Sequence, residues 1–454
     1  MRTLRRIFGV AACLFIAAVS VSGQPANTIH LNGKDYYING INVPWNQFGS
    51  DVGMHYEWGA LYSPSFFTTF FQACQNYGVN CVRLWIHCDG RTSPEFDNNG
   101  NVTGLDTNFF SNFDDIFRIA AASSVMIQPC LWSFDMTKDL TGSAGKYAGL
   151  HANLIQDTNK TRSYIKNALI PMVKRYANTC NLFAWEIINE PEWSISGPGN
   201  TVQLVSDAEM ERFCAMIAEA IHLNSGKMVT IGSACLKWCS SNQPPAAANY
   251  WCDSSLQAVY KHPKAVLDFY EVHYYDWMFN ADWGYDPFQA LKTPAYWKLD
   301  KPTIIGESPA QAGDYTVQQM VDSAFAHGYA GIIPWSYNAN DGVGSWDACK
   351  NQLKAFHDSH AQLIDFQCTA ATLKSDNNGA KPRQSVFADC IGDRPLPSGT
   401  TVKIYTMQGK LVWTRQAGAI SEVAKRFSLK GAFCYQIIDS RGKMLDAGKS
   451  INFY

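Results

Sequence analysis

Short apolar runs alternate along the chain with longer segments of helical periodicity. Eight such runs cover residues 36–45, 79–87, 125–132, 182–191, 228–235, 267–277, 301–310 and 331–338. Amphipathic segments at 64–78, 107–123, 162–178, 207–224 and 316–328 lie between them. Eight buried strands alternating with helices are what a (β/α)8 barrel requires, because each parallel strand needs a crossover to reach the next.

An open doubly wound sheet is the alternative arrangement for the same alternation. Such a sheet usually carries a glycine-rich phosphate loop after an early strand. The sequence contains neither GxGxxG nor GxxxxGK[ST]. The barrel is therefore favoured, and it predicts that functional side chains follow the strands, where they surround one mouth.

Both ends of the chain differ in character from the predicted barrel. Residues 1–23 combine an arginine-containing start with an apolar run and small residues before Gly23. This pattern predicts a cleaved secretory signal peptide, and the apolar run is short for a membrane anchor. We expect the barrel at 24–364, an irregular linker at 365–399, and a small C-terminal β-sandwich-like domain at 400–454.

Charge and aromatic content narrow the class of partner. A formal net charge of −2 does not favour nucleic acid or an anionic membrane, whereas 13% aromatic residues, including 14 Trp, suit a neutral ligand with flat apolar faces. Carbohydrate is such a ligand. We expect a secreted, soluble monomer with no cofactor and no metal.

The cysteines are the one feature of the sequence that could suggest a metal site. Cys235, Cys239 and Cys252 lie close together in sequence, but no His accompanies them at zinc-ligand spacing. Export permits disulfides. The spacing therefore favours a loop disulfide with one spare thiol.

Three carboxylates occur within the segment AWEIINEPEW at 184–193. Glu190 ends the fourth apolar run and Glu307 ends the seventh, so a barrel would bring them together across its mouth. Glycoside hydrolysis uses such a pair. Glu186 lies four residues before Glu190 and is expected deeper in the barrel, paired with a residue such as Arg83. Glu192 follows a proline and is expected on the loop surface or rim.

Other polar and aromatic residues accompany the pair. His273 and Tyr275 are two positions apart and can project to the same side of a strand. Arg83 would keep a nearby carboxylate ionised. Trp335 ends the eighth run and offers a flat floor for a sugar ring. Together they predict a site.

The motifs WEIINEP, VRLW, HYYDW, IIGES and PWSY, in their order along the chain, resemble glycoside hydrolase family 5 of the retaining (β/α)8 clan. The resemblance covers roughly residues 27–363 and adds Trp85, within VRLW, as a candidate substrate-binding residue. It implies Glu190 as acid/base, Glu307 as nucleophile, Asn189 bonded to the sugar 2-hydroxyl, Arg83 and Tyr275 holding the nucleophile, His273 positioning the acid/base, and Trp335 flooring subsite −1.

The stretches INVPWNQFG, VRLWIHCDGRTSPEFD and CLWSFDM look most like the endo-β-1,4-mannanase branch, which implies a β-mannan polysaccharide as substrate. Many family members have a His after the third strand, where this chain has Leu131, Trp132 and Ser133. Trp132 is therefore expected to act as a wall of the site instead. The alternatives are a β-1,4-glucanase and a non-catalytic carbohydrate-binding barrel.

The C-terminal segment leaves two interpretations open. KIYTMQGKLVWT and LKGAFCYQIIDSRGKML resemble C-terminal sorting domains of some secreted bacterial polysaccharidases. A carbohydrate-binding sandwich is the other interpretation.

Overall fold

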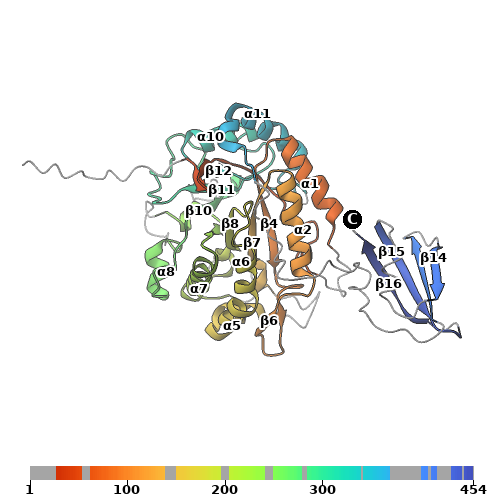
Figure 1. Ribbon diagram of the computed structural model, residues 1–454. Coiled ribbons are helices and arrows are strands. Elements are labelled where there is room, and N and C mark those ends of the chain that lie inside the picture. The colour runs from red at the N-terminus through yellow and green to blue at the C-terminus, as the bar shows by residue number, and fades with distance from the viewer. Residues whose placement is uncertain are drawn as a thin grey trace, which may run out of the picture. The chain divides into compact units, whose positions relative to one another are not determined.

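The structure of the protein is a computed structural model (Figure 1). It describes residues 27–53, 62–138, 150–195, 204–240, 249–278, 284–338, 341–368, 400–406, 411–416, 431–441 and 444–452. The predicted signal peptide and most of the predicted linker lie outside these ranges. The described residues form two units, which divide between Leu373 and Lys374.

A closed barrel of eight parallel strands forms the first unit and confirms the predicted fold. All eight predicted runs contain a barrel strand. Neighbours in the barrel are also neighbours in the sequence, as short crossovers require. In barrel order the strands are β3 (Ile38–Asn42), β4 (Cys81–Cys88), β7 (Met126–Ser133), β8 (Ala184–Asn189), β9 (Met228–Ser233), β10 (Tyr270–His273), β11 (Thr303–Glu307) and β12 (Gly331–Ile332).

Helices cover the outside of the barrel (Figure 1). The α-helices are α1 (Pro64–Asn76), α2 (Phe109–Ala122), α4 (Leu150–Gln156), α5 (Thr158–Tyr164), α6 (Ile170–Arg175), α7 (Asp207–Ser225), α8 (Asp253–Val259), α9 (Asp276–Met278), α10 (Val317–Ala326) and α11 (Trp346–Ile364). A π-helical turn, η4 (Ile165–Leu169), joins α5 to α6, and the 3-10 turns are η2 (Phe134–Thr137), η5 (Pro191–Ser194) and η6 (Leu236–Trp238). Among the described residues, none of the helices has the length and apolarity to cross a membrane.

Local sequence explains where the longer helices begin and end. Ser206 and Glu209 form a reciprocal capping box at the start of α7, and Thr316 with Gln319 does the same for α10. Each box satisfies backbone N–H groups that a helix start leaves without partners. Gly226 ends α7 in the left-handed conformation at φ 63°, which glycine adopts without steric cost.

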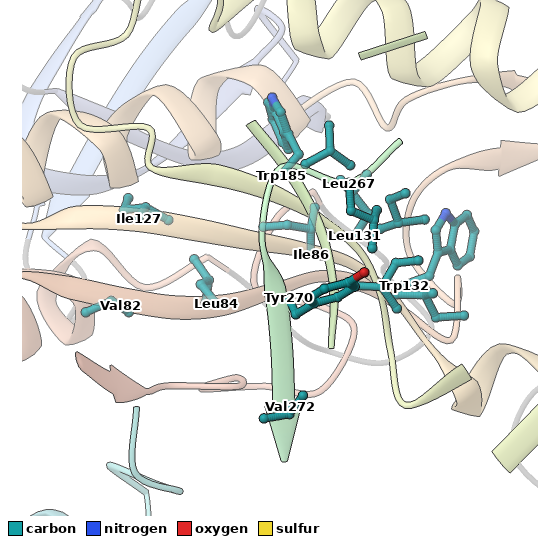
Figure 2. Close-up of a cluster of buried hydrophobic side chains, with 14 of the residues drawn as sticks. Val82, Leu84, Ile86, Ile127, Leu131, Trp132, Trp185, Leu267, Tyr270 and Val272 are labelled. Atoms are coloured by element: carbon teal, nitrogen blue, oxygen red, sulfur yellow. The ribbon is translucent and has the colours of Figure 1, made fainter. Parts of the chain in front are cut away.

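Alternation along the strands separates an apolar outer layer from a polar interior. In β4, Val82, Leu84 and Ile86 belong to the cluster packed between strands and helices, part of which Figure 2 shows. Arg83 and Trp85, between them, face inward. Both faces of the strand are buried, as expected for a parallel sheet covered by helices.

Two short hairpins accompany the barrel. β1 (Ile29–Leu31) pairs with β2 (Lys34–Tyr36), and β5 (Glu95–Phe96) pairs with β6 (Val102–Gly104).

The end of the barrel unit extends beyond the expected boundary at 364. Phe366 is 4% exposed and packs with Tyr36 at 5.9 Å between ring centroids. Cys368 forms a disulfide with Cys180, which precedes β8. Residues up to Cys368 therefore belong to the barrel unit, at the end of the strands opposite to Glu190 and Glu307.

This disulfide differs from the one that the sequence suggested. Cys235, Cys239 and Cys252 are free thiols, so a disulfide among them is a wrong prediction. The Cys252 sulfur instead lies 3.2 Å from Ser255 Oγ and 3.4 Å from the carbonyl of Asn249.

The described part of the second unit is a four-stranded antiparallel sheet in the order β14-β13-β15-β16. Its strands are β13 (Thr401–Thr406), β14 (Leu411–Gln416), β15 (Gly431–Ile438) and β16 (Met444–Asn452). β13 pairs with β14 and β15 pairs with β16, both in antiparallel orientation. The described residues of this unit contain one sheet, not the two layers of the expected sandwich.

Candidate active site

Two glutamates at the ends of strands β8 and β11 meet at the mouth of the barrel. Glu307 is the last residue of β11, and Glu190 directly follows β8. His273, at the end of β10, lies between them, with its Nδ1 at 2.9 Å from Glu190 Oε1 and 3.6 Å from Glu307 Oε1. One oxygen of each carboxylate and this nitrogen all lie within 4.8 Å of one another. Such a group could also ligate a metal ion, and both carboxylates and the imidazole have the chemistry for acid/base catalysis.

Arg83 organises the floor of the site. Its guanidinium is fully buried and donates to Glu307 Oε1 at 2.6 Å. Two further N–H groups form a bidentate pair with Glu186, both at 2.6 Å, which confirms the predicted role of Glu186 below the site. Arg83 also donates to Asn189 Oδ1 at 2.7 Å, so the amide nitrogen is the end of Asn189 that can donate to a ligand.

A third buried carboxylate, Glu271, shares the same guanidinium and was not predicted. Glu271 Oε1 lies 3.0 Å from Arg83 Nε, and Gln128 donates to Glu271 Oε2 at 2.7 Å. Burial and the negative charge of Glu186 raise the pKa of Glu271 well above its ordinary value. Although burial opposes ionisation, Arg83 holds the pKa of Glu186 below its ordinary value. The opposite directions of these two shifts favour the proton on Glu271 rather than on Glu186.

Each of the two mouth glutamates has its own set of hydrogen-bond donors. Tyr275 OH donates to Glu307 Oε2 at 2.7 Å, so Glu307 receives bonds from both Arg83 and Tyr275. Trp193 Nε1 donates to Glu190 Oε2 at 2.8 Å. Glu307 thus has a fixed cation beside it and Glu190 does not, which favours the ionised form of Glu307.

The pKa shifts follow these contacts. Burial raises the pKa of Glu190 to about 7, against the effect of the Trp193 hydrogen bond and Arg83. Burial also raises the pKa of Glu307, and Arg83 and Tyr275 limit that rise. Burial lowers the pKa of His273 to about 4, so its ring is neutral at neutral pH. Burial thus favours the protonated form of Glu190, and the bonds from Arg83 and Tyr275 favour the ionised form of Glu307.

An aromatic cavity of about 430 Å³ opens above the two glutamates. The ring of Trp85 lies 5.7 Å from that of Trp335 and 5.2 Å from that of Trp45. These rings offer flat apolar surfaces beside side chains that can form hydrogen bonds to hydroxyl groups. The lining residues are Trp45, Phe48, Trp85, Phe134, Asp135, Asn189, Glu190, Tyr275, Trp277, Glu307, Trp335, Asp341 and Val343.

The structure corrects the prediction that Trp132 forms a wall of this site. Trp132 is 0% exposed and packs against His87 and Tyr164, with ring centroids 5.0 and 5.3 Å apart, in the apolar cluster of Figure 2. The pairing of β4 with β7 is irregular between Trp85 and Cys88. Beyond this irregularity Trp132 pairs with Cys88, and its side chain packs in the outer apolar cluster rather than in the cavity.

Asp135, in the turn η2 that follows β7, lines the cavity where a wall was expected. Its carboxylate accepts from Ser133 Oγ at 2.6 Å and pairs with Lys138 at 2.7 Å. The predicted motif CLWSFDM contains Asp135. The burial of Trp132 is visible only in three dimensions.

Glu192 is also placed differently from the prediction of a surface position. Its side chain is 5% exposed, and it accepts from Ser233 Oγ at 2.6 Å, Trp251 Nε1 at 2.7 Å and the backbone N–H of Ala234 at 3.1 Å. Pro191 begins the turn η5, which folds back against the end of β9. Glu192 does lie outside strand β8, as the preceding proline predicts. The turn that contains it is mostly buried and not exposed.

The chain is similar to known mannan-degrading enzymes. A mannan endo-1,4-β-mannosidase of Mytilus edulis is 31% identical over 357 residues, which cover 74% of this chain and 92% of that protein. One of Cryptopygus antarcticus is 26% identical over 380 residues, covering 77% and 93%. The crystal structure of an endo-1,4-β-mannanase from Eisenia fetida matches with a TM-score of 0.64 and 26% identity, over 76% of this chain and 97% of that one. No protein-family profile matches the chain.

An eight-stranded barrel with a glutamate pair at its mouth defines the class of (β/α)8 glycoside hydrolases. Within that class, the chain belongs to the family of the mannan endo-1,4-β-mannosidases, as its resemblance to family 5 predicted.

Proposed function

We propose that this protein hydrolyses internal β-1,4-mannosidic bonds of mannan, galactomannan or glucomannan with retention of configuration. The observation that carries the reaction type is that one carboxylate oxygen of Glu190 lies within 4.8 Å of one carboxylate oxygen of Glu307. Carboxyl groups ~5–5.5 Å apart suit attack on the sugar, whereas inverting enzymes need ~6.5–9.5 Å to admit a water. The relatives support mannan rather than cellulose as the substrate.

Glu307 is the nucleophile of the first step. Arg83 and Tyr275 fix its carboxylate and keep it ionised. One oxygen attacks the anomeric carbon and the glycosidic C–O bond breaks. Protonated Glu190 gives its proton to the leaving oxygen. This step yields a glycosyl ester of Glu307 and a shortened chain with a free hydroxyl.

Glu190 changes role in the second step. Now ionised, it takes a proton from a water molecule, which attacks the anomeric carbon from the face that the leaving sugar vacated. The ester bond breaks and Glu307 regains its carboxylate. His273 and Trp193, each bonded to one oxygen of Glu190, hold it in position through both proton transfers.

The cavity walls bind the sugars. Trp335, Trp85 and Trp45 supply faces on which pyranose rings can lie, and Asn189 Nδ2 is positioned to donate to the sugar 2-hydroxyl. A secreted monomer fits a polymeric substrate that cannot enter the cell.

The function is tested with the purified mature protein on soluble galactomannan and on carboxymethylcellulose. We expect a rapid fall in viscosity and mixed oligosaccharides from galactomannan, because an open cleft cuts inside the chain, and at least about tenfold lower activity on the glucan. Release of single mannose units, or a preference for cellulose, would overturn the assignment.

The two roles are separated by substitution. Glu307→Gln should lower turnover on every substrate by far more than tenfold, or ~1.4 kcal/mol of barrier, and added azide should not restore a retained product. Glu190→Ala should lose most activity on galactomannan, where acid catalysis typically contributes ~10²–10⁴-fold. It should keep kcat/KM on an aryl β-mannooligoside with a good leaving group. Equal loss on both substrates would exclude Glu190 as the acid.

A further inference from the structure

The carboxylate of Glu192 is buried in the turn η5, which follows β8. It receives hydrogen bonds from Ser233, Trp251 and Ala234, which lie at the end of β9 and in the segment before α8. All three donors are buried. Within the described part of the chain, Glu192 forms no ion pair. Its two oxygens are thus held by neutral donors that converge from two different segments.

A short path of contacts joins Glu192 to Glu190. Both belong to the turn after β8, and the backbone N–H of Trp193 donates to the carbonyl of Glu190 at 3.1 Å. The Trp193 side chain returns to Glu190 Oε2 at 2.8 Å. Fixing Glu192 on β9 therefore fixes the turn from which Trp193 reaches the carboxyl of Glu190.

The backbone of Glu190 shows why this turn needs an external anchor. Glu190 has φ 47° and ψ 51°, the left-handed region that side-chain-bearing residues rarely adopt. Such a conformation persists only where the surroundings impose it. The N–H of Glu190 donates to the carbonyl of Gly232 at 2.6 Å, also on β9. Glu192 and this bond attach the turn to the same strand on either side of Pro191.

We propose that Glu192 is a positioning residue for acid/base catalysis, which holds the η5 turn on β9 so that Trp193 and the Glu190 carboxyl keep their geometry. This inference rests on the proposed function and adds a residue to it. Glu192 does not line the cavity and touches no substrate. Its loss should therefore affect the step that needs a proton more than substrate binding.

The test uses Glu192→Gln, because glutamine has the same shape but places an NH2 group against three donors, which leaves at least one of them unsatisfied. We expect kcat/KM on galactomannan to fall about tenfold or more, as part of the general-acid contribution is lost. On an aryl β-mannooligoside with a dinitrophenolate leaving group, kcat/KM should change less than about threefold, since that group needs no proton. KM for galactomannan should stay unchanged.

Two variants separate this effect from a general loss of stability. Trp251→Phe removes only one donor to Glu192 and should give the same leaving-group dependence in weaker form. Asp286→Asn is the matched control, because Asp286 is 1% exposed and accepts from Tyr315 OH and the N–H of Phe288 in the same manner. It should lower the melting temperature without changing the ratio of the two activities. An equal loss on both substrates for Glu192→Gln, with the ratio unchanged, would overturn the proposal.

A double-mutant cycle distinguishes failure of this proposal from failure of the proposed function. If Glu192 acts only through Glu190, adding Glu192→Gln to Glu190→Ala should cause no further loss. Additive losses would show that Glu192 acts elsewhere and would overturn the positioning role. If Glu190→Ala alone shows no leaving-group dependence, the acid assignment itself fails.

Discussion

At the scale of single residues, the site depends on giving two similar carboxyl groups different protonation states. Burial raises the pKa of both Glu190 and Glu307. Only Glu307 receives hydrogen bonds from Arg83 and Tyr275, and these favour its ionised form. The sequence predicted that Arg83 would hold the nucleophile's pKa down; the structure shows that Arg83 limits a rise that burial causes.

The pH dependence follows from these shifts. Catalysis requires Glu190 protonated and Glu307 ionised, so kcat/KM should be bell-shaped. Glu190 loses its proton as the pH rises through its pKa of about 7, which sets the alkaline limb. The acidic limb appears as the pH falls through the pKa of Glu307, which lies above its ordinary value.

Asp135 provides the matched variant for the pH profile. Its charge contributes to the raised pKa of Glu190, so Asp135→Asn should move the alkaline limb to lower pH and leave the acidic limb in place. The measurement is kcat/KM across pH on soluble galactomannan. A profile that stays flat from weakly acidic to alkaline pH would contradict the assignment of the pair.

At the scale of elements, the side chains that fill the barrel interior leave room only for glycine at two strand positions. A Cβ at Gly232 would lie 2.4 Å from Glu186 Oε1 and 2.9 Å from Arg83 Nη2. A Cβ at Gly306 would lie 2.2 Å from Glu271 Oε1. The buried ion network therefore occupies space that side chains on these strands would otherwise fill.

Gly232→Ala should displace Arg83 and Glu186 and thereby disturb Glu307. We expect kcat to fall at least about tenfold and the melting temperature to fall, because a partly broken buried ion pair costs ~3–5 kcal/mol. Gly104→Ala is the control, since a Cβ there meets nothing within 4 Å. Wild-type kinetics for Gly232→Ala would mean that the network relaxes without cost. Thermal denaturation and steady-state kinetics are the measurements.

At the scale of the whole molecule, the chain leaves the barrel at the end opposite to the catalytic mouth. The Cys180–Cys368 disulfide and Phe366 attach that exit to the barrel unit. All the residues named in the described site belong to the first unit. The catalytic unit should therefore work without the C-terminal sheet.

Truncation after Leu373 should leave kcat/KM on soluble galactomannan unchanged. Truncation after Ile364 removes Phe366 and Cys368 as well, and it should lower stability, because a disulfide that closes a long loop contributes ~2–4 kcal/mol. Cys180→Ser in the full chain isolates the disulfide. If the protein truncated after Leu373 loses activity on short soluble oligosaccharides, the second unit completes the barrel or the cleft.

The same truncation tests what the second unit does. If that unit sorts the protein, the shorter chain should be mislocalised in its host but bind insoluble mannan as before. If it binds carbohydrate, binding to insoluble polymer should weaken, because stacked aromatic side chains would be lost.

The sequence by itself determined the barrel and the meeting of Glu190 with Glu307 at its mouth. Periodicity marks buried strands and amphipathic helices, and a barrel necessarily gathers the strand ends at one mouth. The positions of Glu190 and Glu307 after the fourth and seventh strands therefore predicted their meeting, and the pairing of Glu186 with Arg83 followed from strand alternation.

Tertiary structure decided the surroundings of that pair. Trp132 turned outward and packs against His87 and Tyr164, and Glu192 turned inward because its turn folds onto β9. Glu271, one of several polar residues in its predicted run, joined the ion network because Arg83 reaches it from β4. Such outcomes depend on register, turn direction and contacts between segments far apart in the chain, and local patterns of hydrophobicity contain none of these.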